Sequence, residues 1–581
     1  MAEESKSWIL TPRTLYELGI EAVVDNFHRV KECWTRLPDS VLFDVLSKLH
    51  AWREFKLLGN ALSNFEMFSK LLKVSDQRVR LLVLFQTVLV DGMEINKELE
   101  VGYGSYCFMV EINPSIRDKV INLGLKLGKF LSDAGCYVES ESVLLNCKDL
   151  CMAEAHTPQD WCRVLDCCHK LLHTQSAYCE LDRAAETYKL ALLMISRLTN
   201  EGYTDVNHAG LYTEFSVLFF IRSEFNEAYK WSVEAMKHLK PTLPANIIVD
   251  VFRQAGKACI VKREFQRAGL LIQQASYLAR QVFGPHHLKY SDALVDYGFY
   301  LLNYDSFVDS VSVYEEALQI RRKIFGRLSL HIATVHEELA YALYVQDYVT
   351  GKFQEARLHA EIAIKIMEML LPNNHFLLAS AKRIKALILE EIALDTGATP
   401  MSGQNLLLEA ESLHLSALKL TESVFGKENV LTAKHYGNLG RLYQSMQRYK
   451  QAEEMHLTAI NIKEALLGPD DLEVGLSIGH LASLYTYHLD RHLCAEKLYF
   501  RSIEINIRLF GESYSGLEYD YQGLLRVYTV LHRTDKQMEY TEILNRWRRL
   551  RENRILLEDH ELDLEKDPDP VDAVIQKFFN M

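Results

Sequence analysis

One short signature recurs from residue 283 onward and constrains the fold more than any other feature. Phe-Gly pairs occur at 283–284, 325–326, 425–426 and 510–511, and Leu-Gly stands at 467–468. The glycines at 284 and 326 are 42 residues apart, as are those at 426 and 468, and 43 residues separate 468 from 511. The interval from 326 to 426 holds two longer units, with a loop insertion at 395–405. A fixed period of this length is typical of a repeat array, in which each unit packs against its neighbours.

The clearest unit, Thr432 to Gly468, predicts two helices joined by a tight turn at Arg448. Apolar residues fall at helical spacing in both halves. They are Tyr436, Leu439, Leu442 and Tyr443 before the turn, and Ala452, Met455, Ala459, Ile462 and Leu466 after it. Gly440 and Ala452 are small, which lets the paired helices approach closely. Gly468 is placed to end the second helix in the left-handed conformation.

This pattern resembles the tetratricopeptide repeat in its long, kinesin-light-chain-like form. The resemblance is carried by "YGNLGRLY" with "AEEMHLTAI", by "GHLASLY" with "AEKLYFRSI", and by "EELAYALY" with "EARLHAEIAI". Weaker matches extend the array from residue 113 to residue 550, which amounts to about ten helix pairs. The resemblance implies an all-α fold, a right-handed superhelical solenoid of tetratricopeptide-like helix pairs with a concave groove.

Charge and cysteine content narrow the function classes. The 581 residues carry 78 acidic and 65 basic side chains, a net charge of -13, which argues against general nucleic-acid binding. The first residues lack the pattern of a secretory signal and the longest apolar runs are too short to span a bilayer, so we expect an intracellular protein. Eleven cysteines without a CxxC pair indicate neither a zinc site nor a disulfide framework. We interpret Cys167 and Cys168 as buried thiols rather than a redox pair.

Motifs of catalysis are missing from the sequence. No Gly-rich loop ends in Gly-Lys-Ser/Thr, no HExxH occurs, and the segment at 102–107 fails the Gly-x-Ser-x-Gly pattern. We therefore predict a non-catalytic protein with no catalytic residue, no metal ligand and no cofactor.

The groove is the predicted binding site. In repeats of this kind the concave surface is lined chiefly by one edge of the first helix of each pair. Acidic groups concentrate at 290–345 and basic groups at 382–441, an arrangement that suits a peptide with a basic side chain and a terminal carboxylate. The alternative is that these are ordinary polar residues on a solvated face. The predicted substrate-binding residues are Asp292, Asp296, Glu337, Tyr341, Lys382, Lys434, Asn438 and Arg441.

The N-terminal stretch begins with a predicted helix, which Thr14 and Glu17 cap as a capping box. Leu15, Leu18, Ala22, Val23, Phe27 and Val30 would form one broad apolar face along it, and a second helix starts at Leu37-Pro38. One interpretation is an N-terminal cap of the solenoid.

The other interpretation rests on two linear motifs. "TLYELGIEAV" resembles the elongin C-binding box and "LPDSVLFDV" resembles the cullin box that follows it. The resemblance assigns elongin binding to Leu15, Leu18, Gly19 and Val23, and cullin binding to Leu37, Pro38, Val41 and Val45. The elongin box has Cys where this sequence has Gly19, which removes a packing side chain and lowers helix propensity by about 1 kcal/mol relative to alanine.

Segments along residues 8 to 550 resemble a family of tetratricopeptide-repeat substrate receptors of cullin-2 RING ubiquitin ligases. Among them are "FNEAYKWSVEAMK", "KYSDALVDYGFYLLN" and "TAKHYGNLGRLYQSM". This resemblance implies elongin C with elongin B and cullin-2 with its RING subunit as partners, and C-terminal degrons with Arg near a terminal Gly as ligands. It also implies links to the cytoplasmic tail of amyloid precursor protein and to microtubules, dimerisation of some members, and a cytoplasmic and nuclear location.

Two functions follow as hypotheses. The first is the substrate-recognition subunit of a cullin-2/elongin B/C RING E3 ubiquitin ligase, and the second is an adaptor that links membrane-protein tails to microtubule-based transport. The predicted domains are an N-terminal helical region at 8–112, with the elongin box at 14–23 and the cullin box at 37–45, and a superhelix at 113–550. An acidic, mostly disordered tail at 551–581, with a short helix at 570–579, completes the chain.

Overall fold

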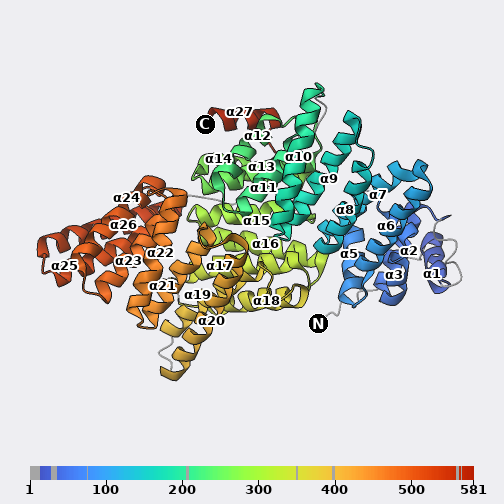
Figure 1. The fold of residues 1–581 in the computed structure, drawn as a ribbon. Helices are drawn as coiled ribbons and strands as arrows, with labels where there is room; N and C mark the ends of the chain where they lie inside the picture. Colours follow the sequence, from blue (N-terminus) through green and yellow to red (C-terminus); the bar gives the residue numbers. More distant parts are fainter. Residues whose placement is uncertain are drawn as a thin grey trace, which may run out of the picture. The chain divides into compact units, whose positions relative to one another are not determined.

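The computed structural model describes residues 14–27, 36–74, 76–203, 208–348, 351–395, 400–557, 562–563 and 566–581. Within these residues the chain is built of helices without strands (Figure 1). This confirms the predicted all-α fold class, a solenoid of tetratricopeptide-like helix pairs. None of the helices in the described ranges is both long enough and apolar enough to cross a bilayer.

A group of helices precedes the regular pairs. They are α1 (Leu15–Asp25), α2 (Asp39–Ala51), α3 (Phe55–Leu62), α4 (Phe65–Leu71), α5 (Arg78–Val90) and α6 (Ile95–Ile112), followed by a 3₁₀ turn, η2 (Pro114–Ile116). Consecutive pairs then begin with α7 (Arg117–Asp133) and α8 (Tyr137–Met152), α9 (Pro158–Ala177) and α10 (Leu181–Asn200), α11 (His208–Ile221) and α12 (Phe225–Lys237), and α13 (Ala245–Val261) and α14 (Phe265–Phe283).

The array continues with α15 (Leu288–Asn303) and α16 (Phe307–Phe325), α17 (Leu330–Asp347) and α18 (Gln354–Leu370), α19 (Leu378–Asp395) and α20 (Pro400–Phe425), α21 (Val430–Ser445) and α22 (Tyr449–Leu467), α23 (Leu472–Tyr487) and α24 (His492–Phe510), and α25 (Leu517–Val530) and α26 (Thr534–Leu557). The last helix is α27 (Val571–Asn580).

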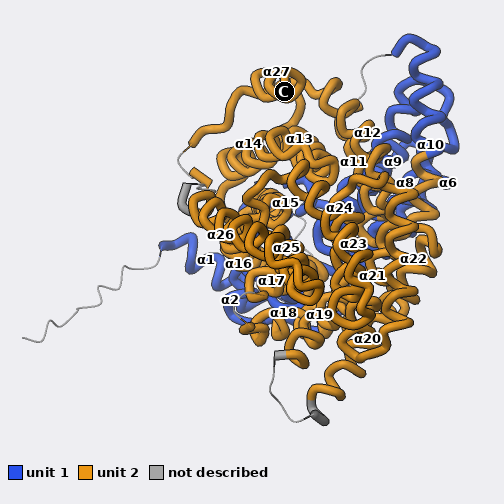
Figure 2. The backbone as a smooth tube through the Cα atoms, turned by 90° about the vertical axis from the view of Figure 1, so that its left-hand side faces the viewer, with its two compact units in different colours: residues 1–174, 189–204, 322–328 blue, residues 175–188, 205–321, 329–581 orange. Residues whose placement is uncertain are grey.

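The chain divides into two compact units (Figure 2). Unit 1 comprises residues 1–174, 189–204 and 322–328, and unit 2 comprises residues 175–188, 205–321 and 329–581.

The pair α21 and α22 shows how the sequence pattern produces the packing. Gly440 lies where an added Cβ would come within 2.7 Å of the His456 ring, so the predicted close approach of the two helices is confirmed. The buried face of α22 differs from the predicted one, because Leu466 is exposed and two polar residues, His456 and Lys463, are buried. Lys463 is tolerated there because it is bound to a carboxylate on the next helix, Glu473.

Residues with a positive backbone φ angle end the repeats, and such residues also form the turn between the two helices of most pairs. Gly468 has φ +91°, as the sequence predicted, and glycines 284, 326, 426 and 511 are left-handed too. Inside the pairs, the left-handed position is often taken by a residue with a side chain, such as Arg263, Asp305 or Gln447. That conformation costs a residue with a Cβ about 1–2 kcal/mol, so the packing of each pair must hold these turns in place.

Two turns of unit 2 bind elements far along the sequence. The Asp305 carboxylate accepts hydrogen bonds from the Ser515 backbone N–H at 3.0 Å and from the Arg551 guanidinium. The Asn429 side-chain amide donates to the Arg222 carbonyl at 3.1 Å. These contacts join early and late pairs of unit 2.

The C-terminal segment requires a correction to the predicted tail. α26 continues to Leu557 and α27 is a packed helix beside α14 (Figure 1), where the predicted tail was mostly disordered. The Arg267 guanidinium lies 5.4 Å from the centre of the Phe578 ring, and the Asp569 N–H donates to the Gln274 side chain at 2.7 Å. The physical reason is that Val574 and Phe578 give α27 an apolar stripe, which α14 buries. The predicted short helix at 570–579 corresponds to α27.

Candidate functional site

A cavity of about 590 Å³ lies in unit 2, and most of its wall comes from the first helices of five successive pairs: α15, α17, α19, α21 and α23. The turns at Arg263 and Asp305 and the segment around Tyr514 complete it. This volume falls in the range of ordinary ligand sites. The helix edges that form the wall are the ones that the repeat register assigned to binding.

Five of the eight predicted groove residues line this cavity: Glu337, Tyr341, Lys434, Asn438 and Arg441.

The other three predicted residues lie outside the lining. Lys382 donates a hydrogen bond to a serine of α20. Asp292 accepts from the Arg321 guanidinium and Asp296 from the Arg253 guanidinium, each at 2.7 Å. Because these two carboxylates are neutralised by cations of this chain, they stabilise the repeat and are poorly placed to attract a basic ligand.

One part of the cavity wall is rich in carboxylates. Glu337 and Glu338 are consecutive residues of α17, and both line the cavity. Burial and the neighbouring carboxylate raise the pKa of Glu337 to about 7, and burial also raises the pKa of Glu338. Arg383 of α19 favours the ionised form of both, whereas Lys257, which also acts on Glu338, is bound 3.3 Å from Asp296. Among the described residues, one unpaired guanidinium therefore faces two carboxyl groups.

Another part of the wall has an excess of cations. Lys434 of α21 lies 2.8 Å from one Glu473 oxygen, and Lys463 of α22 lies 3.0 Å from the other. Burial alone would raise the pKa of Glu473, but the two ammonium groups hold it well below its usual value. Lys463 also donates to Ser477 at 3.0 Å. Two ammonium groups thus contact one carboxylate in this part of the cavity, and Asp471 also acts on Lys463.

Arg441, another basic residue of the wall, is already paired with carboxylates. Its guanidinium lies 2.7 Å from Glu391 and 3.3 Å from Glu390, and it donates to the Tyr344 hydroxyl at 3.2 Å. Arg441 therefore holds α21 to α19 and α17 and offers little free charge to a ligand.

Aromatic rings cover much of the remaining wall. Tyr341, Tyr344, Phe376, Phe510 and Tyr514 line the cavity, and the Phe510 and Tyr514 rings stack with centroids 4.3 Å apart. The Arg383 guanidinium lies 5.4 Å from the centre of the Tyr341 ring. Flat apolar faces beside a few charged groups are typical of a surface that binds a peptide backbone and selected side chains.

The sequence analysis missed Glu338, Arg383, Lys463 and Glu473. Glu338 could have been found, because it follows Gly326 at the same spacing at which Asp296 follows Gly284 and Asn438 follows Gly426. Lys463 was missed for a different reason. It lies on α22, the second helix of its pair, and only apolar residues were expected on the inner face of that helix.

A separate candidate surface lies in unit 1, on α1. Of the four predicted elongin-binding residues, Leu15 is 90% exposed, Leu18 is 46% exposed, Gly19 is exposed, and Val23 is half-buried. The Leu15 side chain, at the first position of α1, is therefore accessible to a partner.

α1 is anchored by its opposite face. Ile20, Val24 and Phe27 are buried, the Tyr16 hydroxyl donates to Asp44 at 2.7 Å, and Lys48 lies 2.7 Å from Glu21. The predicted capping box is present, with hydrogen bonds in both directions between Thr14 and Glu17. The predicted single apolar face is therefore split into a buried and an exposed part, and Val30 lies outside the described residues.

The predicted cullin-binding residues are placed differently from one another. Pro38 is exposed at the start of α2, and Leu37 and Val41 are half-buried. Val45 is fully buried with Leu42 and Leu46. The assignment of Val45 to a partner contact is corrected accordingly, because this side chain packs in the interior of unit 1 and supports the helix that presents the other three.

A match to a protein-family profile agrees with the repeat fold. A sequence profile described as tetratricopeptide repeat matches residues 403–465. A solved Rap protein in complex with competence and sporulation factor is similar at 12% identity, with a TM-score of 0.48 over 67% of this chain and 99% of that chain. A putative kinesin light chain of Podosopora anserina is similar at 18% identity, with a TM-score of 0.27 over 38% of this chain and 97% of that chain.

Two curated relatives are much more similar in sequence. The amyloid protein-binding protein 2 of Mus musculus is 47% identical over 579 residues, which cover 100% of this chain and 98% of the relative. The protein of the same name from Rattus norvegicus matches with the same identity and coverage. Such similarity over the full length establishes common descent and a common fold, so this chain belongs to the amyloid protein-binding protein 2 family.

Proposed function

We propose that this chain is the substrate-recognition subunit of a cullin-2/elongin B/C RING E3 ubiquitin ligase. It binds C-terminal degrons, with an arginine near a terminal glycine, in the cavity of unit 2, and so promotes ubiquitination and proteasomal degradation of its substrates. The chain itself is a non-catalytic adaptor. The observation that carries this proposal is that one cavity holds two charge imbalances of opposite sign, on different repeats.

The terminal carboxylate of the ligand binds at Lys434 and Lys463. These two ammonium groups share Glu473, so a second carboxylate completes the charge balance there. Lys434 is the more accessible of the two, with 37% of its side chain exposed, whereas Lys463 keeps 5%. Charge-assisted hydrogen bonds of this kind are roughly twice as strong as neutral ones.

The arginine of the ligand binds at Glu337 and Glu338. Its guanidinium supplies the positive charge that Arg383 alone does not provide for two carboxyl groups. A planar guanidinium also stacks on a tyrosine ring, and Tyr341 already shows this geometry with Arg383.

Docking to the ligase occurs through unit 1. Leu15 inserts into elongin C, with Leu18, Gly19 and Val23 beside it, and Leu37, Pro38 and Val41 contact cullin-2. Elongin B and the RING subunit join through these partners. The proposed location is the cytoplasm and nucleus.

The cavity is tested with C-terminal peptides and the full chain bound to elongins B and C. Replacing the terminal carboxylate with an amide is expected to weaken binding about tenfold or more, as is replacing arginine with neutral citrulline. Lys434→Gln should remove most of the acid-versus-amide difference, and Glu337→Gln should remove most of the arginine-versus-citrulline difference. Lys497→Gln, at an exposed lysine of α24, is the matched control. Equal effects of both cavity variants on all three peptides would contradict the assignment.

The docking surface is tested with Leu15→Asp. This side chain is almost fully exposed, so the charge should leave helix content intact while it abolishes co-purification with elongin C. Leu493→Asp, at an exposed leucine of α24, is the control and should co-purify normally. Retained elongin binding in Leu15→Asp would show that the docking surface lies elsewhere.

A second candidate function is an adaptor that links membrane-protein cytoplasmic tails, such as that of amyloid precursor protein, to microtubule-based transport. The name of the two curated relatives, which refers to amyloid protein binding, favours it. The two functions differ in their need for α1. Deletion of residues 14–50 should leave cargo positioning unchanged if transport is the function, and should abolish substrate turnover if ubiquitination is.

A further inference from the structure

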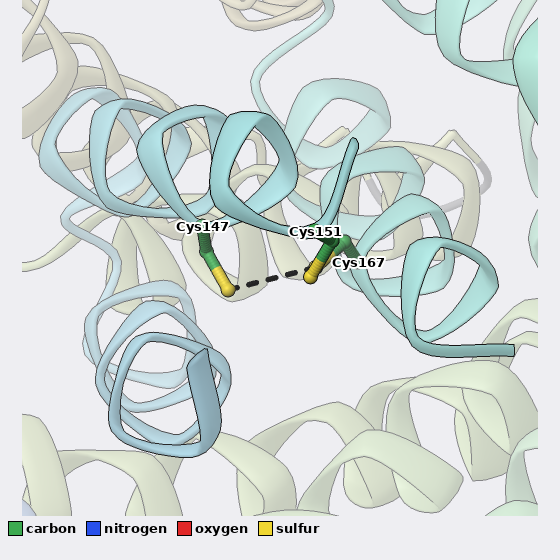
Figure 3. A group of neighbouring side chains, drawn as sticks. All are labelled: Cys147, Cys151 and Cys167. Carbon is green, nitrogen blue, oxygen red and sulfur yellow. Dashed lines mark hydrogen bonds between the residues drawn. The ribbon is translucent and has the colours of Figure 1, made fainter. Parts of the chain in front are cut away.

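Three buried cysteines of unit 1 converge between two helices. Cys147 and Cys151 lie one turn apart on α8, and Cys167 faces them from α9 (Figure 3). The Cys167 sulfur is 3.6 Å from that of Cys147 and 3.7 Å from that of Cys151, and all three sulfurs lie within 4.8 Å of one another. Each side chain is at most 2% exposed.

These separations are close to those of a coordinated cation. Metal–thiolate bonds of about 2.3 Å place the sulfurs of a trigonal or tetrahedral site about 3.8–4.0 Å apart. We propose that Cys147, Cys151 and Cys167 form a three-thiolate site for a soft d¹⁰ cation, with Cu⁺ as the favoured occupant.

The donor set argues for this choice of cation. Thiolates select Cu⁺ and Zn²⁺ over hard cations. Structural zinc sites almost always have four protein ligands, whereas this group has three, and within the described residues it includes no histidine or carboxylate. Three-coordinate thiolate ligation is well suited to Cu⁺, which has no requirement for a fourth ligand. Each thiol that becomes a ligand loses its proton, so binding releases protons.

The surroundings hold the last turn of α8 beside the sulfurs. The Arg117 guanidinium donates to the Leu150 carbonyl at 2.8 Å, which fixes the last turn of α8 beside Cys151. Three thiolates and one monovalent cation leave a net negative charge. The two neighbouring guanidiniums are already ion-paired, Arg117 with Glu154 at 2.6 Å and Arg163 with Asp118 at 2.7 Å.

The proposed entry path is at the end of α8. Cys151 is the penultimate residue of the helix, and the exposed residues 153 and 154 begin the connection to α9. A cation can therefore reach Cys151 first and pass to the two deeper sulfurs.

The sequence did not reveal this group, because Cys147 and Cys151 have CxxxC spacing and not the CxxC spacing typical of zinc sites. A CxxxC spacing places two sulfurs on one face of a helix, and the third ligand comes from the following helix. The prediction of no metal ligand is therefore replaced by this proposal, which is independent of the proposed ligase function and concerns different residues.

The test is an anaerobic titration of the reduced full-length chain with Cu⁺ in the presence of a competing chelator. One equivalent is expected, with an ultraviolet thiolate-to-copper charge-transfer band, and X-ray absorption should show sulfur neighbours only. Cys151→Ser and Cys167→Ser should lose this equivalent. Cys168→Ser is the matched control, since Cys168 is equally buried next to Cys167 but lies outside the group, and it should bind normally.

A parallel Zn²⁺ titration identifies the cation. One equivalent of Zn²⁺ that outcompetes Cu⁺ would keep the thiolate site but overturn the choice of copper. Binding that persists in Cys151→Ser and Cys167→Ser, or nitrogen and oxygen neighbours in the wild-type absorption spectrum, would overturn the site itself. The spectrum of the wild-type chain decides the matter even where a serine variant fails to fold.

Discussion

The glycine in the middle of α1 offers a sharp test of the docking surface. Glycine in a helix interior costs about 1 kcal/mol relative to alanine. A Cβ added at Gly19 would meet no atom within 4 Å, and the residue is exposed on the same face as Leu15. Gly19→Ala should therefore stabilise α1 by about 1 kcal/mol without steric cost. If elongin C binds the folded helix, the dissociation constant should fall up to about fivefold.

The control for this change lies in another helix of unit 1. Gly104 of α6 also has open space around its added Cβ, so Gly104→Ala brings a comparable gain in helix stability far from α1 in the sequence. Calorimetric titration with elongins B and C measures affinity, and hydrogen exchange of the α1 amides measures local stability. Slower exchange in Gly19→Ala with unchanged elongin affinity would refute the view that α1 forms the contact. Tighter binding in Gly104→Ala would show a general effect of stability.

Three further predictions concern pH and stability. Because the pKa of Glu337 is raised to about 7, arginine-containing peptides should bind about tenfold more tightly at pH 8 than at pH 6, and a titration with Glu337→Gln should show no such dependence. Burial lowers the pKa of His456 to about 3, below the unfolded value, so the stability it confers is present above pH 6.5 and is lost as the pH falls toward 3. Between pH 7 and 5 the wild-type chain should lose about 2 kcal/mol of unfolding free energy relative to His456→Phe in denaturant titrations, and equal losses would contradict the linkage. Gln447 has φ +61°, so Gln447→Gly should raise unfolding free energy by about 0.5–1 kcal/mol, whereas Gln447→Ala, which keeps a Cβ, should not.

The architecture was predictable because a glycine marks the end of most repeat units in the sequence. The glycines at 284, 326, 426, 468 and 511 end helices through a conformation that residues with a Cβ disfavour, so their spacing fixes the unit length. The inner turns gave no comparable signal, since several of them place a residue with a side chain in the left-handed conformation. Asp305 is held there by contacts to Ser515 and Arg551, which are remote in the sequence.

The cavity was predictable only in part, for reasons of charge rather than position. The repeat register pointed to helix edges that line the cavity, and Glu337 and Lys434 lie in that lining. It could not show which charges are already matched, because the partners of Arg441 and Asp292 come from other helices. Ion pairing between repeats is invisible in a single repeat unit.

That distinction between matched and unmatched charge separates structural residues from those suited to ligands. Asp292 contacts Arg321 at 2.7 Å and Arg253 at 3.7 Å, so neutralising it removes a counter-ion from two buried guanidiniums and weakens the solenoid. Lys434 shares the Glu473 carboxylate with Lys463. Neutralising Lys434 therefore leaves Glu473 paired with the Lys463 ammonium group. A variant at Asp292 should therefore change stability more than peptide affinity, and one at Lys434 should do the reverse. The location of a charge in a solenoid groove says little about function until its partners on the neighbouring repeats are known.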